Sequence, residues 1–299
     1  MQQPDQTASD TVNTPATSKA RPVLTAETVE SLQAAAARGL AAFECSLDLR
    51  RSREVVDIDT SGLTVDGLHR PWPEPCKART VYWWDGTQFQ PASRYDGALI
   101  KLVPTDWGPP TFEIDGIKML PTAKVSPWDD ARRKVALVNP RGARILDCCG
   151  GLGYFAACAL AGGAAQVQSF EKSADVLWLR TLNPWSPASD PALTVYHNDI
   201  AAVITELPTA SFDAVLHDPP RFGIAGELYS QQFYDQLARV LRIGGWLFHY
   251  TGTPNKLTSG RNVPGEVSRR LEKAGFNTRL EGDGVLARRV EFTNRSGSL

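Results

Sequence analysis

The sequence predicts an α/β fold in which a small α+β domain precedes a doubly wound sheet. Short apolar strands alternate with helices in the second half of the chain, and this alternation is typical of a parallel sheet covered on both faces. A glycine-rich turn separates the first of these strands from its helix. The last two strands, Phe276–Leu280 and Val285–Val290, are joined by a short glycine-containing turn that predicts an antiparallel hairpin.

The first part of the chain divides into a tail and a strand-rich domain. Residues 1–22 are rich in Thr, Ser, Ala and Gln, which favours a disordered tail over a secretory signal. Apolar residues recur at helical spacing over Thr25–Phe43, which predicts a helix. We expect the small domain to cover residues 23–124 and the larger one residues 125–299. Strands of the small domain are predicted at Val56–Asp59, Leu63–Asp66, Thr80–Trp84, Ala98–Val103 and Thr111–Gly116.

In the larger domain each predicted strand except the last two is followed by a predicted helix. The strands are Arg144–Cys148, Val167–Glu171, Thr194–His197, Ala214–Asp218 and Trp246–Tyr250. The helices are Ala156–Leu160, Ala174–Leu182, Ile200–Leu207, Gln231–Leu241 and Pro264–Gly275.

The bulk composition excludes several classes of protein. The net charge of -1 predicts no general attraction to nucleic acid or to a membrane surface, and no apolar run is long enough for a membrane span. Five scattered cysteines, two of them adjacent, do not form a disulfide framework, and the four histidines lie far apart. We therefore expect a reducing, cytoplasmic location and no metal site.

The segment from Ala143 to Ala156 is the most informative part of the chain. A short apolar strand ends at Asp147, and Gly151 and Gly153 lie in the turn that follows. Strand, tight turn and helix in this order present backbone N–H groups to a cofactor. A carboxylate beside the turn would repel a pyrophosphate but tolerate a cationic cofactor such as S-adenosylmethionine. The glycine pattern alone also fits a nicotinamide-dependent oxidoreductase, which stays an alternative.

Acidic residues follow the next two strands. Glu171 ends the second strand, where an acid can accept both ribose hydroxyls of a nucleoside. Asn198 and Asp199 end the third strand and offer acceptors for an adenine amino group. Asp199 is equally well placed to cap the helix that begins at Ile200, and the two roles are compatible.

The fourth strand ends in Asp218, Pro219 and Pro220, followed by Arg221 and Phe222. Two prolines make the chain leave the sheet rigidly, with fixed φ and no N–H donors. The Asp218 carboxylate and nearby carbonyls would then face the crevice and hold an N–H group for methyl transfer. Phe222 is suited to stack on a planar substrate, and Arg221 to meet a phosphate.

Together these residues resemble class I S-adenosylmethionine-dependent methyltransferases, over about Val125 to the C-terminus. A narrower resemblance, to a group of predicted and mainly archaeal methyltransferases, rests on several short motifs. These are Pro127-Trp128-x-Asp130, Asp147-Cys-Cys-Gly-Gly-Leu-Gly-Tyr154, Leu182-Asn-Pro-Trp185, His217-Asp-Pro-Pro-Arg-Phe222, Gly226-Glu-Leu-Tyr229 and Phe248-His-Tyr250. The resemblance implies a Rossmann-like, seven-stranded sheet that ends in an antiparallel hairpin.

The resemblance also implies residue roles. Asp147, Cys149, Gly151 and Gly153 would lie around the methionine part of the cofactor, Glu171 would hold the ribose, and Asn198 and Asp199 the adenine. Asp218, Pro219 and Pro220 would face the acceptor, with Trp128, Arg221, Phe222 and Tyr229 on the substrate side. One departure matters: Cys149 stands where the family has glycine, so we expect a differently shaped turn.

The acceptor is open at this point. RNA is the first expectation, with N-methylation as the reaction; a small molecule or a protein side chain is an alternative. Gly226–Tyr234 resembles polyamine synthases, so aminopropyl transfer is the main rival, although Arg221 would repel a polyamine. A non-catalytic module with the same fold is the last alternative.

Overall fold

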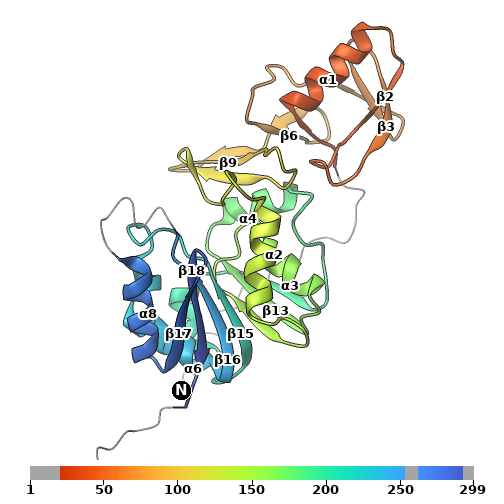
Figure 1. The fold of residues 1–299 in the computed structure, drawn as a ribbon. Coiled ribbons are helices and arrows are strands. Elements are labelled where there is room, and N and C mark those ends of the chain that lie inside the picture. Colours follow the sequence, from red (N-terminus) through yellow and green to blue (C-terminus); the bar gives the residue numbers. More distant parts are fainter. Residues whose placement is uncertain (1–20, 253–261, 292–299) are drawn as a thin grey trace, which may run out of the picture. The chain divides into compact units, whose positions relative to one another are not determined.

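The computed structural model describes residues 21–252 and 262–291 of the 299-residue chain (Figure 1). The predicted tail, residues 1–22, lies outside the described residues except for Arg21 and Pro22. The described residues form two compact units. The first unit contains residues 131–173 and the described residues from 190 onward; the second contains the described residues up to 130 together with Ala174–Ser189. The domain limits proposed at residues 124 and 125 stay a prediction.

A seven-stranded sheet forms the centre of the first unit (Figure 1), in the order β14-β13-β12-β15-β16-β18-β17. Strands β12 to β16 are parallel to their neighbours in this group, and β18 runs antiparallel to both β16 and β17. The strands are β12 (Arg144–Asp147), β13 (Gln166–Glu171), β14 (Leu193–His197), β15 (Phe212–His217), β16 (Leu241–Tyr250), β17 (Phe276–Glu281) and β18 (Gly284–Arg289). The prediction of a mixed α/β fold with a large central sheet is therefore confirmed.

The central strands of this sheet are buried on both faces. Consecutive residues of a strand point to opposite faces, and Ile145 and Leu146 in β12 are both fully buried, as are Ala214 and Val215 in β15. On one face, Leu146 and Val215 share an apolar core with helices α5 (Ile200–Val203), α6 (Gln231–Val240) and α8 (Val263–Lys273). Helix α3 (Tyr154–Ala161) packs against β12 and β13. Burial on both faces explains why the sequences of these strands are continuous apolar runs instead of alternating apolar and polar residues.

Local signals place several helix ends. Ser230 and Asn262 cap α6 and α8 by accepting a backbone N–H from the first turn. The helix predicted over Ile200–Leu207 is shorter: α5 ends at Val203, and a 3₁₀ turn, η1 (Ile204–Glu206), follows. The sequence analysis did not predict helix α2 (Pro127–Leu137). Its signals were present, since the Ser126 hydroxyl accepts the Asp129 N–H at 2.9 Å and Pro127 takes the first helical position.

The second unit is strand-rich, as predicted, and contains three small antiparallel sheets with the orders β1-β6-β7, β2-β3-β4-β5 and β11-β10-β9-β8. It also contains helices α1 (Ala26–Ala37) and α4 (Ala174–Leu182). The strands are β1 (Val23–Thr25), β2 (Ala42–Cys45), β3 (Glu54–Ile58), β4 (Gly62–Val65), β5 (Leu68–Pro71), β6 (Val81–Trp84), β7 (Phe89–Pro91), β8 (Ser93–Tyr95), β9 (Leu99–Val103), β10 (Thr111–Ile114) and β11 (Ile117–Lys118).

The helix predicted over Thr25–Phe43 is confirmed as far as Ala37 and is wrong beyond it. Thr25 is the N-cap, and α1 ends at Ala37 because Gly39, with φ of 79°, turns the chain out of the helix. The residues that follow form β2, which pairs with β3. This pairing joins segments about a dozen residues apart, so helical periodicity could not indicate it.

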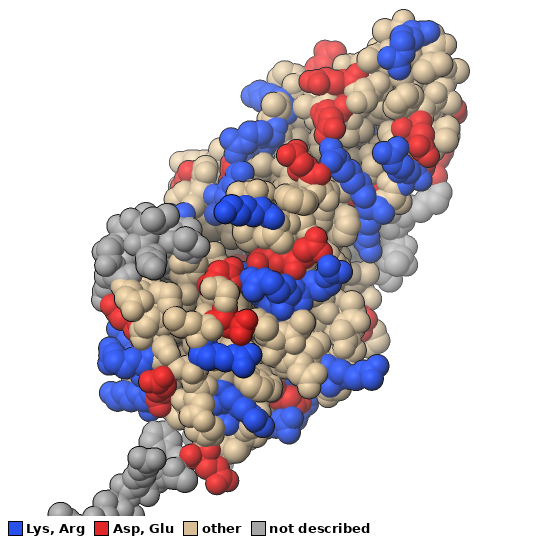
Figure 2. All heavy atoms as spheres, in the orientation of Figure 1, with Lys and Arg blue, Asp and Glu red and all other residues tan. Residues whose placement is uncertain are grey.

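Two surface properties bear on function. Among residues 21–252 and 262–291, no helix is long and apolar enough to cross a membrane. On the face drawn in Figure 2, Lys and Arg side chains are interspersed with Asp and Glu side chains. This mixture agrees with the net charge of -1 and provides no broad basic field on that face for a polyanion.

Candidate active site

The parallel strands of the first unit bring their carboxyl ends to one edge of the sheet. Asp147 lies in register with Ser169 of β13 and with Leu216 of β15. Glu171 ends β13, and Asp218 follows directly after β15. Ligands of open α/β sheets bind in the crevice at this edge, so the three predicted acids occupy the expected place.

Asp147 is fully buried, and its Oδ2 accepts a hydrogen bond from the Ser169 hydroxyl at 2.8 Å. The carboxylate therefore lies beneath the glycine turn, where a ligand arriving from solvent cannot touch it without a rearrangement. Its influence on such a ligand would be exerted mainly through its charge, which favours a cationic group above the turn.

The turn after β12 leads into the N-terminus of α3 and depends on glycine. Its left-handed residues are Gly151, with φ of 49°, and Gly153, with φ of 83°. Cys149 does not adopt a left-handed backbone, so the turn does not strain this residue; a turn shaped differently from the family's stays a prediction. The Gly150 N–H donates to the Phe170 carbonyl at 2.8 Å, which ties the turn to β13.

Glu171 braces the same turn with both carboxylate oxygens. Oε2 accepts the Gly151 N–H at 3.0 Å, and Oε1 accepts the Ser173 N–H at 2.9 Å. The side chain is half-buried at the end of β13. Charge-assisted bonds of this kind fix a carboxylate firmly, and its contact with a ribose stays a prediction.

Asp199 performs the capping role that the sequence predicted. Its Oδ1 accepts the Ala201 N–H at 2.9 Å, and its Oδ2 lies 3.8 Å from the Lys172 ammonium. The Asn198 N–H donates to the Glu171 carbonyl at 3.1 Å and so joins the ends of β14 and β13. Whether either residue contacts an adenine stays a prediction.

The thiol of Cys149, which follows β12, is hard to ionise. Burial raises its pKa well above the ordinary value, and charge interactions with Cys148, Glu171, Asp147 and Asp218 raise it further. A thiol that stays protonated is a poor nucleophile, so this environment does not favour Cys149 as a nucleophile.

The sequence analysis missed the partner of Asp218. Lys134, on α2, is fully buried, and its Nζ lies 3.6 Å from Asp218 Oδ2 and 3.7 Å from Asp283 Oδ2. The ammonium also lies over the Tyr250 ring, 4.0 Å from its centroid. Arg133 donates to the other oxygen of Asp283 at 2.8 Å. A lysine among other charged residues of a helix is expected to be exposed to solvent. The pairing of Lys134 with Asp218 and Asp283 could therefore be found only in the folded structure.

The turn Asp218-Pro219-Pro220 rests on buried aromatic and histidine side chains. The Tyr229 hydroxyl donates to the Pro220 carbonyl at 3.0 Å, and Tyr229 is only 1% exposed. It belongs to a 3₁₀ turn, η2 (Gly226–Tyr229). In this structure Tyr229 therefore holds the turn, and its predicted contact with substrate would need a change of conformation.

His217 and His249 pack edge to face behind this turn, with ring centroids 4.5 Å apart. His217 Nε2 lies 3.1 Å from the Leu228 carbonyl, and His249 Nδ1 lies 2.8 Å from the Tyr250 carbonyl. Carbonyls only accept, so both nitrogens carry hydrogen. Burial lowers the pKa of His217 to about 4 and that of His249 well below its usual value, so both rings are neutral near pH 7.

The remaining predicted substrate residues differ in exposure. Arg221 is exposed, and Phe222 is half-buried with its ring edge-on to Tyr229 at 5.5 Å. Trp128 lies in the second unit, where its ring packs against Trp185 at 5.5 Å. Its role in the second unit is therefore packing, and contact with substrate stays a prediction.

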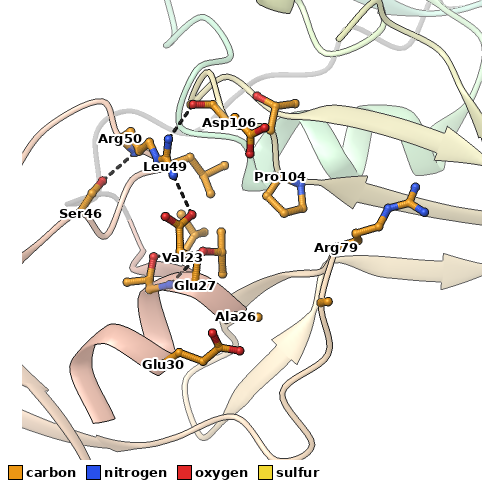
Figure 3. Close-up of a pocket in the computed structure, with 15 residues that line it drawn as sticks. Val23, Ala26, Glu27, Glu30, Ser46, Leu49, Arg50, Arg79, Pro104 and Asp106 are labelled. Carbon is orange, nitrogen blue, oxygen red and sulfur yellow. Dashed lines mark hydrogen bonds and ion pairs between the residues drawn. The ribbon is translucent and has the colours of Figure 1, made fainter. Parts of the chain in front are cut away.

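The second unit has a pocket of about 320 Å³ of its own (Figure 3). Glu27 and Arg50 face one another there, joined by a 2.7 Å ion pair, and Arg50 also donates to the Asp106 carbonyl at 2.6 Å. The charges of Glu27 and Arg50 thus compensate each other within the protein, so we propose no ligand for this pocket. Among the described residues, no group of three or more His, Cys, Asp or Glu side chains is placed to hold a metal ion.

The comparisons with known proteins agree with this fold. No family model matches the chain. An uncharacterized protein of Methanocaldococcus jannaschii is 43% identical over 194 residues, which cover 64% of this chain and 66% of that protein. The chain thus spans just under two thirds of the length of this archaeal relative.

The solved structures to which the chain is similar include a spermidine synthase and an S-adenosylmethionine-dependent methyltransferase. A spermidine synthase solved with the transition state analogue AdoDATO has a TM-score of 0.53 and 18% identity, over 65% of this chain and 70% of that one. An S-adenosylmethionine-dependent methyltransferase from Mesorhizobium loti has a TM-score of 0.42 and 17% identity, over 56% of this chain and 99% of that one. At this identity, the first likeness shows a shared fold and nothing about the reaction.

The charges at the sheet edge favour a cationic nucleoside cofactor. Asp147 is buried at the end of β12, and Glu171 braces the glycine turn beside it. Both carboxylates would repel a pyrophosphate placed at this turn. On these grounds S-adenosylmethionine fits the edge better than a nicotinamide dinucleotide.

Proposed function

We propose that the protein is an S-adenosylmethionine-dependent methyltransferase that methylates a nitrogen atom, with RNA as the acceptor. The observation that carries the proposal is that the register of β12 with β13 and β15 brings Asp147, Glu171 and Asp218 to the same carboxyl edge of the sheet, beside the glycine turn that opens α3. When bound, S-adenosylmethionine supplies a methyl group on a sulfonium and leaves as S-adenosylhomocysteine.

The acceptor side of the reaction depends on orientation. The Asp218 carboxylate accepts a hydrogen bond from the acceptor N–H and aims the nitrogen lone pair at the methyl carbon. It also takes up the proton that the nitrogen loses, which then passes to water. Tyr229 holds the Pro219-Pro220 turn that carries this carboxylate. Correct orientation alone accounts for about 7–11 kcal/mol of a barrier in model reactions.

Calorimetric titration tests the cofactor directly. We expect S-adenosylmethionine and S-adenosylhomocysteine to bind saturably and NADH not to bind. A Glu171→Ala variant should lose most of this affinity. Saturable binding of NADH, with no heat from S-adenosylmethionine, would replace the proposal with an oxidoreductase.

A second assay tests the acceptor. The protein is incubated with S-adenosylmethionine labelled in its methyl group and with total RNA, and the label in digested nucleosides is measured. Label in an N-methylated nucleoside supports the proposal. Label confined to small molecules or to protein would keep the methyltransferase and overturn the RNA acceptor.

Aminopropyl transfer is the rival because spermidine synthases share the fold. It predicts tight binding of decarboxylated S-adenosylmethionine together with a diamine. Titrations with S-adenosylmethionine and with its decarboxylated form decide between methyl transfer and aminopropyl transfer, because a methyltransferase needs the carboxylate of the cofactor and a polyamine synthase does not.

A further inference from the structure

We propose that Arg270, on α8, is a positioning residue for the turn that carries Asp218, and that it acts through Tyr229. The inference rests on the proposed function for the role of Asp218. It goes beyond that function by giving a part in orienting the acceptor to a helix that contributes no residue to the predicted site. Arg270 lies 41 residues beyond Tyr229 in the chain.

The 3₁₀ turn η2 ends with two carbonyls that side chains of distant elements satisfy. His217 Nε2 donates to the Leu228 carbonyl at 3.1 Å, and Arg270 Nη1 donates to the Tyr229 carbonyl at 2.5 Å. Carbonyls at the end of a helical turn have no partner within that turn, so each needs a donor from outside. The end of η2 is therefore attached to β15 through His217 and to α8 through Arg270.

Tyr229 connects this attachment to the turn after β15. Its carbonyl accepts the bond from Arg270, and its hydroxyl donates to the Pro220 carbonyl at 3.0 Å. The side chain is only 1% exposed, and its ring packs against that of His249 with centroids 5.2 Å apart. Because a closely packed ring has little room to adjust, a displacement of the Tyr229 backbone would also displace its hydroxyl.

Asp218 lies between two points of the backbone that are held in place. On one side, His217 belongs to the ladder between β15 and β16. On the other side, Tyr229 holds the Pro220 carbonyl, and the two prolines have fixed φ. Lys134 contacts the carboxylate itself, whereas this second attachment acts on the backbone that carries it. The direction in which Asp218 faces the acceptor therefore depends on where the Pro220 carbonyl is held.

Helix α8 is a firm support for these contacts. Val267 and Leu271 belong to the same buried apolar core as α6. At the start of α6, Gln231 Nε2 donates to the Arg270 carbonyl at 3.1 Å. Arg270 thus joins α8 to the junction of η2 and α6 with both its backbone and its side chain, and the bond from its guanidinium is charge-assisted and correspondingly strong.

Backbone NMR of the full-length protein tests these contacts without any cofactor. The Arg221 amide shares its peptide group with the Pro220 carbonyl, so its ¹⁵N shift responds to the bond from Tyr229. We expect Tyr229→Phe and Arg270→Met to move this signal in the same direction, and the double variant to move it no further than Tyr229→Phe alone. Arg269→Met removes an exposed charge on the same helix and should leave the signal in place.

Methyl transfer to total RNA measures the consequence for the reaction. Arg270→Met should lower the rate several-fold, about as much as Tyr229→Phe, and should leave the affinity for S-adenosylmethionine within about twofold of wild type by calorimetry. The double variant should be no slower than Tyr229→Phe alone, because Arg270 acts through Tyr229. A purely structural role would lower stability without this split between rate and cofactor affinity.

Two results would overturn the inference: an Arg221 signal that does not move in folded Arg270→Met, and rate effects that multiply in the double variant. Arg270→Gln, whose amide ends two atoms short of the guanidinium nitrogens, is judged by the same outcomes if Arg270→Met does not fold. Absence of methyl transfer by wild type would instead refute the proposed function, and the NMR result would still decide whether Arg270 positions the turn.

Discussion

The neighbouring strands β12 and β15 are each followed by a turn at an aspartate, and the two aspartates have opposite environments. Asp147 is fully buried and accepts a hydrogen bond from the Ser169 hydroxyl. Asp218 is partly exposed and faces the buried ammonium of Lys134. An acid that precedes a turn in the sequence therefore does not indicate one particular function. The buried one lies beside the glycine turn, and the partly exposed one is the acid that we propose for the second substrate.

Replacing Asp218 should have the largest effect, because it removes the aspartate that follows β15 and leaves Asp147 after β12 unchanged. Asp218→Ala removes the oxygen that orients the acceptor, so we expect the rate of methyl transfer to fall by about 10³-fold. The affinity for S-adenosylmethionine should change only a few-fold, since we expect that ligand to bind at the ends of β12 and β13. Label transfer and calorimetry measure the two quantities.

Asp235→Ala is the matched control for this experiment, because Asp235 is an exposed acid on α6. It should leave both quantities unchanged. A rate that survives Asp218→Ala would show that orientation at the end of β15 is not what drives the reaction.

Acidification should sharpen the comparison, because two histidines whose pKa is lowered by burial, His217 and His249, lie behind the β15 turn. Burial lowers the pKa of His217 from 6.5 to about 4. The unfolded chain therefore binds more protons in this window, and the free energy of unfolding should decrease as pH falls from 6.5 to about 4. The full effect of this one residue is about 3 kcal/mol.

Denaturant titrations over this pH range measure the effect. His217→Gln cannot titrate and keeps a donor for the Leu228 carbonyl, so its pH dependence should be shallower. His197→Gln, at the half-buried end of β14, is the control and should retain the wild-type slope. Equal slopes in all three proteins would contradict the assignment.

Replacing Glu171 tests the β12 side of the comparison. Glu171→Gln weakens the charge-assisted bonds to Gly151 and Ser173 and the expected bonds to the ribose, at a cost of about 2 kcal/mol. We expect affinity for S-adenosylmethionine to fall by roughly 30-fold by calorimetry. The exposed Glu206→Gln is the control, and an unchanged affinity in Glu171→Gln would remove Glu171 from the cofactor site.

The smallest expected effect concerns the support of the Pro219-Pro220 turn. Tyr229→Phe removes one hydrogen bond, to the Pro220 carbonyl, and should lower the free energy of unfolding by about 1 kcal/mol. Methyl transfer should slow several-fold while cofactor affinity is kept. Tyr196→Phe, whose ring stacks on Phe170, is the control. A wild-type rate in Tyr229→Phe would show that the turn is rigid without this bond.

Local sequence signals determined much of the fold. The strand, glycine turn and helix around Asp147, the capping role of Asp199 and the final hairpin all depend on residues close together in the chain. Such signals act over a few residues, so the sequence could specify them. The same reasoning placed the acids at strand ends, and parallel strands then brought those ends together.

Only the tertiary structure decided how each charged group is compensated. Lys134, Asp218 and Asp283 lie in three separate segments, and nothing near Lys134 in sequence distinguishes it from the exposed Arg132. The sequence likewise could not predict the burial of Asp147 or of the His217–His249 pair. Burial and charge pairing depend on which segments fold against one another, and that is a property of the packed molecule, not of any local pattern.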